Sequence, residues 1–201
     1  MSMNRKEEIV MVTLELAAEK GLANVSMSMI ADKIGIRKPS LYKHFASKEE
    51  IVEAMYEYLR RQAKGKANIK PIDYSTFFEG KTVYEILQSV VRGYIQMNQQ
   101  EHMLNFYKVI YSERSLNPMA AKIVAEETDK MIIATKQLFY AMEVHKLLHF
   151  TNPDMSAVSF AMTVHGLMDY ELDQSNGKCS FETDKNLLND YLKWFCEENA
   201  V

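Results

Sequence analysis

Residues 26–48 hold the pattern that most constrains this chain, because they read as two short helices joined by a tight turn. Ser26 can cap the first helix, since its hydroxyl can accept a hydrogen bond from an N–H of the opening turn. Gly35 follows that helix where a chain often needs positive φ. Pro39 suits the first turn of the second helix, where a missing N–H costs nothing. The pattern therefore predicts a compact helical pair near the N-terminus.

The second helix of this pair has an apolar inner side and a polar outer side. Leu41 and Phe45 lie four residues apart, so we expect both to pack against a core. The residues left outside are hydrogen-bond donors, and the basic ones can meet phosphates: Arg37, Lys38, Ser40, Tyr42, Lys43, His44 and Lys48. A short helix with donors on its outer face fits the major groove of DNA.

This segment resembles the N-terminal signature of the tetracycline-repressor (TetR) family, which marks a helix-turn-helix. The residues that carry the resemblance are Ile30-Ala31, Gly35-Ile36, Lys38, Ser40-Leu41-Tyr42, His44-Phe45 and Ser47-Lys48-Glu49-Glu50. They cover roughly the first quarter to third of the chain, and the remainder agrees only in length and helical character. Arg37 departs from the usual Ser or Thr cap, and Met29 stands where a capping-box acid would be expected.

The resemblance implies a DNA-binding surface with two kinds of contact. Tyr42, His44 and Lys48 match family positions that bind the DNA backbone. The residues that project from the expected recognition helix and can read bases are Lys38, Ser40 and Lys43, with Ser28 and Arg37 as flanking candidates. The residues expected to contact DNA are Ser26, Ser28, Arg37, Lys38, Ser40, Tyr42, Lys43, His44 and Lys48.

Charge is divided unevenly along the chain. Residues 1–66 carry 12 Lys and Arg against 9 Asp and Glu, whereas residues 67–201 carry 12 against 18. A basic N-terminal segment followed by an acidic remainder is typical of a DNA-binding module joined to a sensing or dimerisation module. Chance variation is the alternative explanation. We expect a helix-turn-helix DNA-binding domain in residues 1–66 and an effector-binding and dimerisation domain in residues 67–201.

Cap signals and helical spacing predict an all-α fold of about nine helices. Thr82-x-x-Glu85 forms a capping box, and Asn117-Pro118 and Asn152-Pro153 each place Asn at a cap before Pro. Gly65 to Phe78, with a Pro inside it, is the expected hinge between the modules, and Thr183-Asp184 is expected to open the last helix.

The last two expected helices carry more apolar residues than one buried face needs. The resemblance implies that this helix pair packs against the same pair of a second chain, related by a two-fold axis, to form a four-helix bundle. Such a homodimer presents two recognition helices to a pseudo-palindromic operator in double-stranded DNA. The residues expected at that interface are Val158, Met162, Leu188, Tyr191, Leu192 and Phe195. The alternative is that both helices close the core of a single chain.

The middle helices are rich in aromatic residues and Met, and the whole chain contains 14 Met. Met adapts to ligands of varied shape, and the resemblance implies a small-molecule effector, here apolar or aromatic. The candidate lining residues are Phe106, Tyr107, Met131, Met162 and His165. Ordinary core packing is the competing interpretation for each of them.

Other classes of protein find little support in the sequence. No apolar run approaches the roughly 18 residues of a membrane span, and the N-terminus lacks the apolar core of a signal peptide. Cys179 and Cys196 stand at no metal spacing, so we expect a reducing cytoplasm, no disulfide, no metal and no cofactor. His145 and His149 are four residues apart but lack the further ligands that zinc needs. No catalytic motif occurs, so we expect no enzymatic activity.

These observations lead to one functional hypothesis, a dimeric transcriptional regulator of the TetR type. The family most often represses transcription until a small molecule favours a conformer that does not bind DNA. The alternative is a helical ligand-binding or adaptor protein without operator binding, and the donors at Lys38 and Ser40 argue against it.

Overall fold

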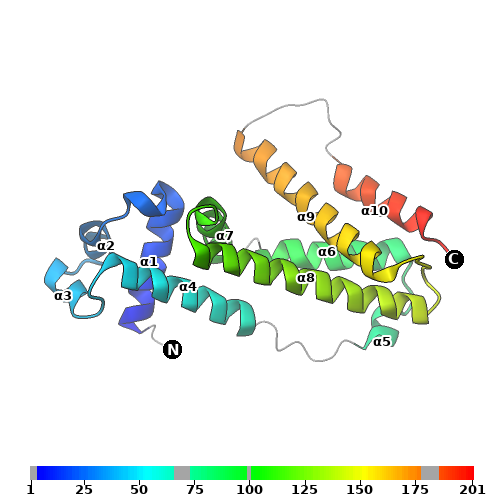
Figure 1. The fold of residues 1–201 in the computed structure, drawn as a ribbon, viewed down its shortest axis with the longest axis horizontal. Coiled ribbons are helices and arrows are strands. Elements are labelled where there is room, and N and C mark those ends of the chain that lie inside the picture. The colour runs from blue at the N-terminus through cyan, green and yellow to red at the C-terminus, as the bar shows by residue number, and fades with distance from the viewer. Residues whose placement is uncertain (1–3, 66–72, 99–100, 178–185) are drawn as a thin grey trace. The chain divides into compact units, whose positions relative to one another are not determined.

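The computed structural model describes residues 4–65, 73–98, 101–177 and 186–201 (Figure 1). Within these ranges the chain forms ten α-helices and one 3-10 helix with no strand, which confirms the all-α prediction. In chain order the elements are α1 (Arg5–Lys20), η1 (Leu22–Asn24), α2 (Met27–Ile34), α3 (Lys38–Tyr42), α4 (Lys48–Gly65), α5 (Tyr74–Phe78), α6 (Val83–Asn98), α7 (Glu101–Glu113), α8 (Pro118–Val144), α9 (Pro153–Gly177) and α10 (Leu187–Glu198).

Several helices begin at the caps that the sequence predicted. The Ser26 hydroxyl accepts a hydrogen bond from the backbone N–H of Met29 at 3.3 Å, which closes the first turn of α2. Thr82 and Glu85 exchange both bonds of a capping box before α6. The Asn117 side chain accepts from the first turn of α8. Each cap satisfies N–H groups that have no partner inside their own helix.

Two parts of the structure differ from the expected helix pattern. The expected hinge contains the short helix α5, because the Asp73 carboxylate accepts hydrogen bonds from the backbone N–H groups of Ser75 and Thr76. This helix raises the number from about nine to ten. The last helix begins at Leu187, and the expected opening at Thr183-Asp184 lies outside the described residues.

The first compact unit comprises residues 1–70 and 97–126. Within it α1 packs against α2, α4 and α7. Fully buried side chains such as Leu14, Met55 and Phe106 form its core, and the start of α8 adds Ile123. The core of this unit therefore includes side chains from α7 and from the start of α8.

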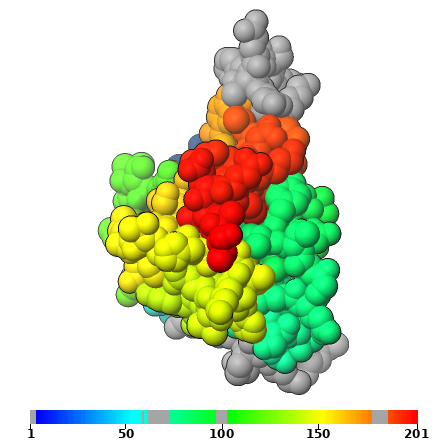
Figure 2. All heavy atoms as spheres, turned by 90° about the vertical axis from the view of Figure 1, so that its right-hand side faces the viewer, coloured from blue at the N-terminus to red at the C-terminus, as the bar shows by residue number. Residues whose placement is uncertain are grey.

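The second compact unit comprises residues 71–96 and 127–201. Its core is largely aromatic: the ring of Phe139 stacks on that of Phe150 at a centroid distance of 4.6 Å, and Phe160 meets Phe195 edge-on at 4.8 Å. These rings bring α8, α9 and α10 together. Figure 2 shows the outer surface of α10, in red, beside α6 in green.

Phe106 lies in the core of the first unit, where only 1% of it is exposed. We expect Phe106→Ala to lower the free energy of unfolding by about 3–5 kcal/mol, because it removes a large buried ring and leaves a cavity. Leu104→Ala is the matched control, since Leu104 is on the same helix and 37% exposed. Urea denaturation followed by circular dichroism measures both. Equal, small losses for the two variants would contradict the position assigned to Phe106.

Candidate nucleic-acid interface

The turn between α2 and α3 depends on the left-handed backbone of Gly35. Its φ is 78°, and its N–H donates to the carbonyl groups of Ala31 and Asp32. The N–H of Ile36 then donates to Ala31 at 3.0 Å. A side chain at residue 35 would be strained in this conformation. The glycine therefore fixes the angle at which the chain leaves α2 and enters α3.

The inner side of α3 is anchored as the sequence predicted. Leu41 is fully buried and Phe45 is 4% exposed, and both belong to the core of the first unit. Arg37 occupies the cap position without a side-chain hydrogen bond, which agrees with its departure from the family pattern. Because the core side chains hold α3 from within, its polar residues are left on the outer side.

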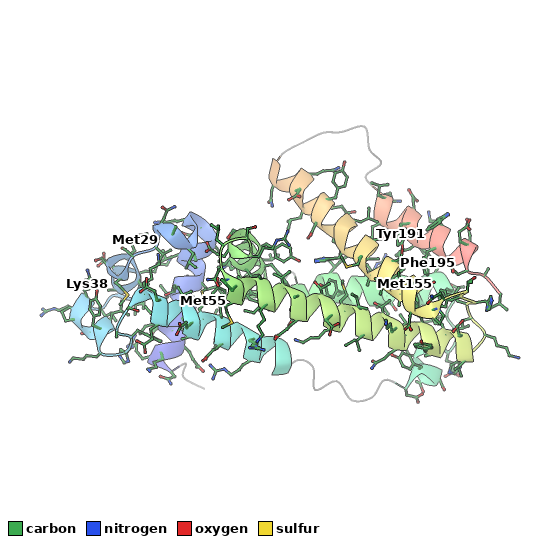
Figure 3. The ribbon with its side chains drawn as sticks, in the orientation of Figure 1. Met29, Lys38, Met55, Met155, Tyr191 and Phe195 are labelled. Atoms are coloured by element: carbon green, nitrogen blue, oxygen red, sulfur yellow. The ribbon has the colours of Figure 1, made fainter. Side chains whose placement is uncertain are left out.

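The residues expected to contact DNA are brought together around α2, the turn and α3. Lys38 lies at the surface of this unit in Figure 3, and its ammonium is 6.0 Å from the ring centroid of Tyr42. The exposed members of the set are Ser26, Ser28, Arg37, Lys38, Tyr42 and Lys43, and the half-buried members are Ser40, His44 and Lys48. This arrangement offers cations and hydroxyls to phosphates and base edges.

Lys48 has an internal role that the sequence did not indicate. Its ammonium donates to the carbonyl oxygen of Leu22 at 2.6 Å and to that of Ala23 at 3.3 Å. These bonds tie the first residue of α4 to η1. Replacing Lys48 would therefore remove a contact inside the protein in addition to any contact with DNA. The partners are far from Lys48 in sequence, so no local pattern could have revealed them.

A hollow of about 400 Å³ lies between α1 and α4 in the same unit. Its charged lining comprises Glu7, Glu50, Glu53 and Glu57 together with Lys6 and Arg61. Acidic groups outnumber basic ones there, so the hollow does not extend the basic surface around α3. The Glu50 carboxylate also accepts a hydrogen bond from the backbone N–H of Ala46.

The five expected effector-binding residues are divided between the two compact units. Phe106 and Tyr107 belong to the first unit, with their ring centroids 5.4 Å apart. Met131, Met162 and His165 belong to the second unit, where Met162 is 49% exposed. The hollow in the first unit is lined by other residues. The pocket therefore stays a prediction.

Three of the six residues expected at a dimer interface fill the core of the second unit instead of its surface. Leu188, Leu192 and Phe195 are at most 8% exposed, because they pack against the aromatic core. Val158 and Tyr191 are half-buried, and Met162 is exposed. Figure 3 marks Tyr191 and Phe195 on α10. The sequence could not separate these groups, since α10 has apolar residues on more than one side.

Two further apolar side chains on these helices are exposed. Met155 on α9 is 59% exposed and Trp194 on α10 is 53% exposed. Contiguous patches of exposed apolar side chains are typical of surfaces that bind other proteins, whereas single exposed apolar side chains are ordinary. Their exposure depends on how the two helices rotate against the core, which the sequence alone does not fix.

The described residues include no group of three or more His, Cys, Asp or Glu that could hold a metal ion. The ring of His145 meets that of Phe78 edge-on at 5.3 Å. Burial raises the pKa of the Cys196 thiol to about 11, with the charge of Glu197 as a smaller cause, so this thiol is protonated at neutral pH. No helix in the described ranges has the length and apolar character needed to cross a membrane.

Comparison with known proteins agrees with this arrangement. The sequence pattern of the bacterial regulatory proteins of the tetR family matches residues 9–55, which contain α2, the turn and α3. The chain is also 30% identical over 138 residues to IcaR of Staphylococcus aureus (strain Newman), the negative transcriptional regulator of the biofilm operon icaADBC. That match covers 63% of this chain and 73% of IcaR.

Solved structures share the fold over nearly the whole length. A TetR-family transcriptional regulator from Marinobacter aquaeolei VT8 is 14% identical, with a TM-score of 0.64 and coverage of 99% of this chain and 92% of its own. A candidate transcriptional regulator from Saccharomonospora viridis, solved in complex with choline, is 19% identical, with a TM-score of 0.67 and coverage of 96% of both chains. The helix-turn-helix, the relationship to IcaR and the shared fold together show that this chain belongs to the TetR family of bacterial transcriptional regulators.

Proposed function

We propose that this TetR-family regulator is a repressor that binds a pseudo-palindromic operator as a homodimer and releases it when a small apolar or aromatic molecule binds. The observation that carries the proposal is the outer side of α3. There Lys38, Tyr42 and Lys43 are exposed on a helix whose inner side is anchored by Leu41. Repression is supported by the relationship to IcaR, a negative regulator.

The α3 surface offers two kinds of contact to DNA. Lys38 and Ser40 stand at the start of α3, where side chains of a recognition helix reach base edges. Lysine can donate hydrogen bonds to guanine O6 and N7, and the serine hydroxyl can donate to or accept from a base edge. Tyr42 is the last residue of α3 and His44 follows the helix, and both side chains suit phosphate oxygens. Base contacts give sequence preference, whereas phosphate contacts give affinity on any sequence.

We expect Lys38→Ala and Ser40→Ala to change sequence preference, with a loss of about 1–3 kcal/mol for each base contact removed. The measurement is binding to a duplex selected by the wild-type protein from random-sequence DNA, compared with binding to an unselected duplex, at several salt concentrations. Lys33→Ala is the control, since Lys33 is an exposed lysine on α2 outside the proposed contact set. Equal losses of affinity on both duplexes would show that Lys38 and Ser40 contact phosphates instead of bases. No salt-dependent binding by the wild type would favour the adaptor alternative.

The homodimer is supported by exposed apolar side chains on α9 and α10. Met155, Met162 and Trp194 are each about half exposed or more, at 59%, 49% and 53%. Covering such side chains with the same surface of a second copy would remove them from water, which favours association. A two-fold dimer would also supply the second recognition helix that a pseudo-palindrome requires.

We expect Met162→Glu to dissociate the dimer and to weaken operator binding, because association would bury a carboxylate without a partner. Sedimentation equilibrium measures the mass, and circular dichroism checks that the helices persist. Leu116→Glu is the control, since Leu116 is 88% exposed at the turn between α7 and α8. Phe195→Glu should instead unfold the second unit, since Phe195 lies in its core. A folded wild-type monomer at micromolar concentration would contradict the dimer.

The effector is supported by composition and by one structural relative. The regulator from Saccharomonospora viridis was solved with choline, so this fold can hold a small organic molecule. In this chain Met131, Met162 and His165 are the candidates in the second unit, and a mostly apolar cavity with few polar groups is typical of such sites.

We expect an apolar or aromatic compound, found by screening for a higher melting temperature, to release the selected duplex at the same concentrations. Linkage requires both effects if the compound prefers the conformer that does not bind DNA. Met131→Ala should change which compounds act while the free protein keeps its affinity for DNA. A compound that raises the melting temperature without affecting DNA binding would contradict its role as an inducer.

A further inference from the structure

The Lys48 ammonium is bound to the protein backbone. It donates to the carbonyl oxygen of Leu22 at 2.6 Å and to that of Ala23 at 3.3 Å, and the residue is half-buried. Lys38 and Lys43, on α3 and directly after it, are both exposed. An ammonium has three N–H donors, so two of those on Lys48 are committed to η1. Lys48 therefore differs from the exposed lysines in what it can offer to DNA.

The place of Lys48 in its helix explains why its charge turns towards η1. Lys48 is the first residue of α4, and a positive charge at the N-terminus of a helix opposes the helix dipole. The carbonyl groups at the end of a helical turn carry partial negative charge, and Leu22 and Ala23 belong to such a turn. A charged donor also makes a stronger hydrogen bond than a neutral one. The contact with η1 therefore gives this ammonium the partners that its own helix end cannot provide.

The contact joins two positions that enclose the whole helix-turn-helix. Leu22 and Lys48 are 26 residues apart in sequence, and α2, the turn and α3 all lie between them. Every other residue expected to contact DNA also lies within this segment. Holding the two ends of a segment together reduces the number of conformations open to it. The Lys48 contact therefore restricts the part of the chain that has to fit the major groove.

Both ends of this segment also reach the core of the first unit. Leu22 and Val25 are 7% and 2% exposed at one end, and Phe45 is 4% exposed at the other. Hydrophobic burial has no preferred direction, whereas a hydrogen bond depends on both distance and angle. The core therefore brings η1 and the start of α4 together, and the ammonium fixes how they are aligned.

We propose that Lys48 is a positioning residue, which closes the helix-turn-helix segment and supports DNA binding through η1 instead of through a phosphate. The ammonium holds the entry to α2 and the start of α4 in one alignment, so that Ser28, Lys38 and Ser40 meet base edges together. This role differs from the contact with the DNA backbone that the family resemblance implies for Lys48. The consequence for affinity rests on the proposed operator binding.

The first test is Lys48→Met in the full chain, which removes the ammonium and keeps an unbranched apolar stem. We expect affinity for the selected duplex to fall by about three- to tenfold, because a partly exposed hydrogen bond from a charged group is lost. Binding to the unselected duplex should change little, and the slope of log affinity against log salt concentration should stay the same. A phosphate contact would instead weaken both duplexes similarly and reduce that slope by about one. That result, or no change in affinity, would overturn the proposal.

Two further variants serve as matched controls. Lys33→Met makes the same change at an exposed residue of α2 outside the proposed contact set, and it should alter neither affinity nor slope. Lys48→Arg keeps a positive charge and several N–H donors, so it should retain most of the wild-type affinity. Equal losses in Lys48→Arg and Lys48→Met would show that the bonds to η1 do not support DNA binding.

Hydrogen exchange of backbone amides, followed by NMR, tests the same contact without DNA. The N–H groups of Asn24 and Val25 donate to the carbonyl oxygens of Gly21 and Leu22, so their exchange reports the opening of η1. In Lys48→Met both amides should exchange about three- to tenfold faster, whereas the amide of Met55, in the buried part of α4, should keep its rate. Unchanged exchange in η1, or a similar increase at all three amides, would contradict a positioning role.

The two measurements separate the possible failures. Faster exchange in η1, in a protein whose wild type shows no salt-dependent binding to DNA, would support the Lys48 contact and contradict the operator-binding function. Normal DNA binding by the wild type, with unchanged exchange in Lys48→Met, would contradict the Lys48 contact alone. Thermal denaturation checks that each variant folds. If Lys48→Met does not fold, Lys48→Gln allows the same slope and exchange measurements, because it removes the charge and keeps a shorter N–H donor.

Discussion

The burial of α1 against α4 and α7 is the contact on which the DNA-binding part of this chain depends. Leu14 and Met55 are both fully buried in the core that these helices share. The helix-turn-helix is too small to bury a core of its own, so α3 holds its orientation only because Leu41 and Phe45 reach this larger core. The orientation of the outer face of α3 therefore depends on helices that are remote in sequence, such as α7.

Polar contacts add further links between the helices that the apolar core brings together. The Lys48 ammonium joins α4 to η1, and the Arg60–Glu126 pair joins α4 to α8. The Arg60–Glu126 pair is individually modest, since partly exposed ion pairs contribute about 0.2–1 kcal/mol. Both contacts involve α4, which is the next helix after α3.

In the second unit, the structure distinguishes buried from exposed apolar residues that look alike in the sequence. Phe139, Phe150, Phe160 and Phe195 form one aromatic cluster, which holds α8, α9 and α10. Aromatic pairs add to the free energy gained by burying their area. Because α10 contributes Phe195 to this cluster, fewer apolar residues of α9 and α10 stay exposed, and they include Met155 and Trp194.

The sequence by itself determined the local features of this protein. Ser26, Gly35, Pro39 and the Thr82–Glu85 box act over a few residues, so their spacing predicted the caps, the turn and the family. Only the tertiary structure decided the roles of residues whose partners are remote. It placed Phe106 in the first core, Leu188 in the second, and the Lys48 ammonium on the carbonyl oxygen of Leu22. Helical spacing shows that a side chain is apolar and which face it shares, but the neighbour that covers that face is chosen by packing across the whole chain.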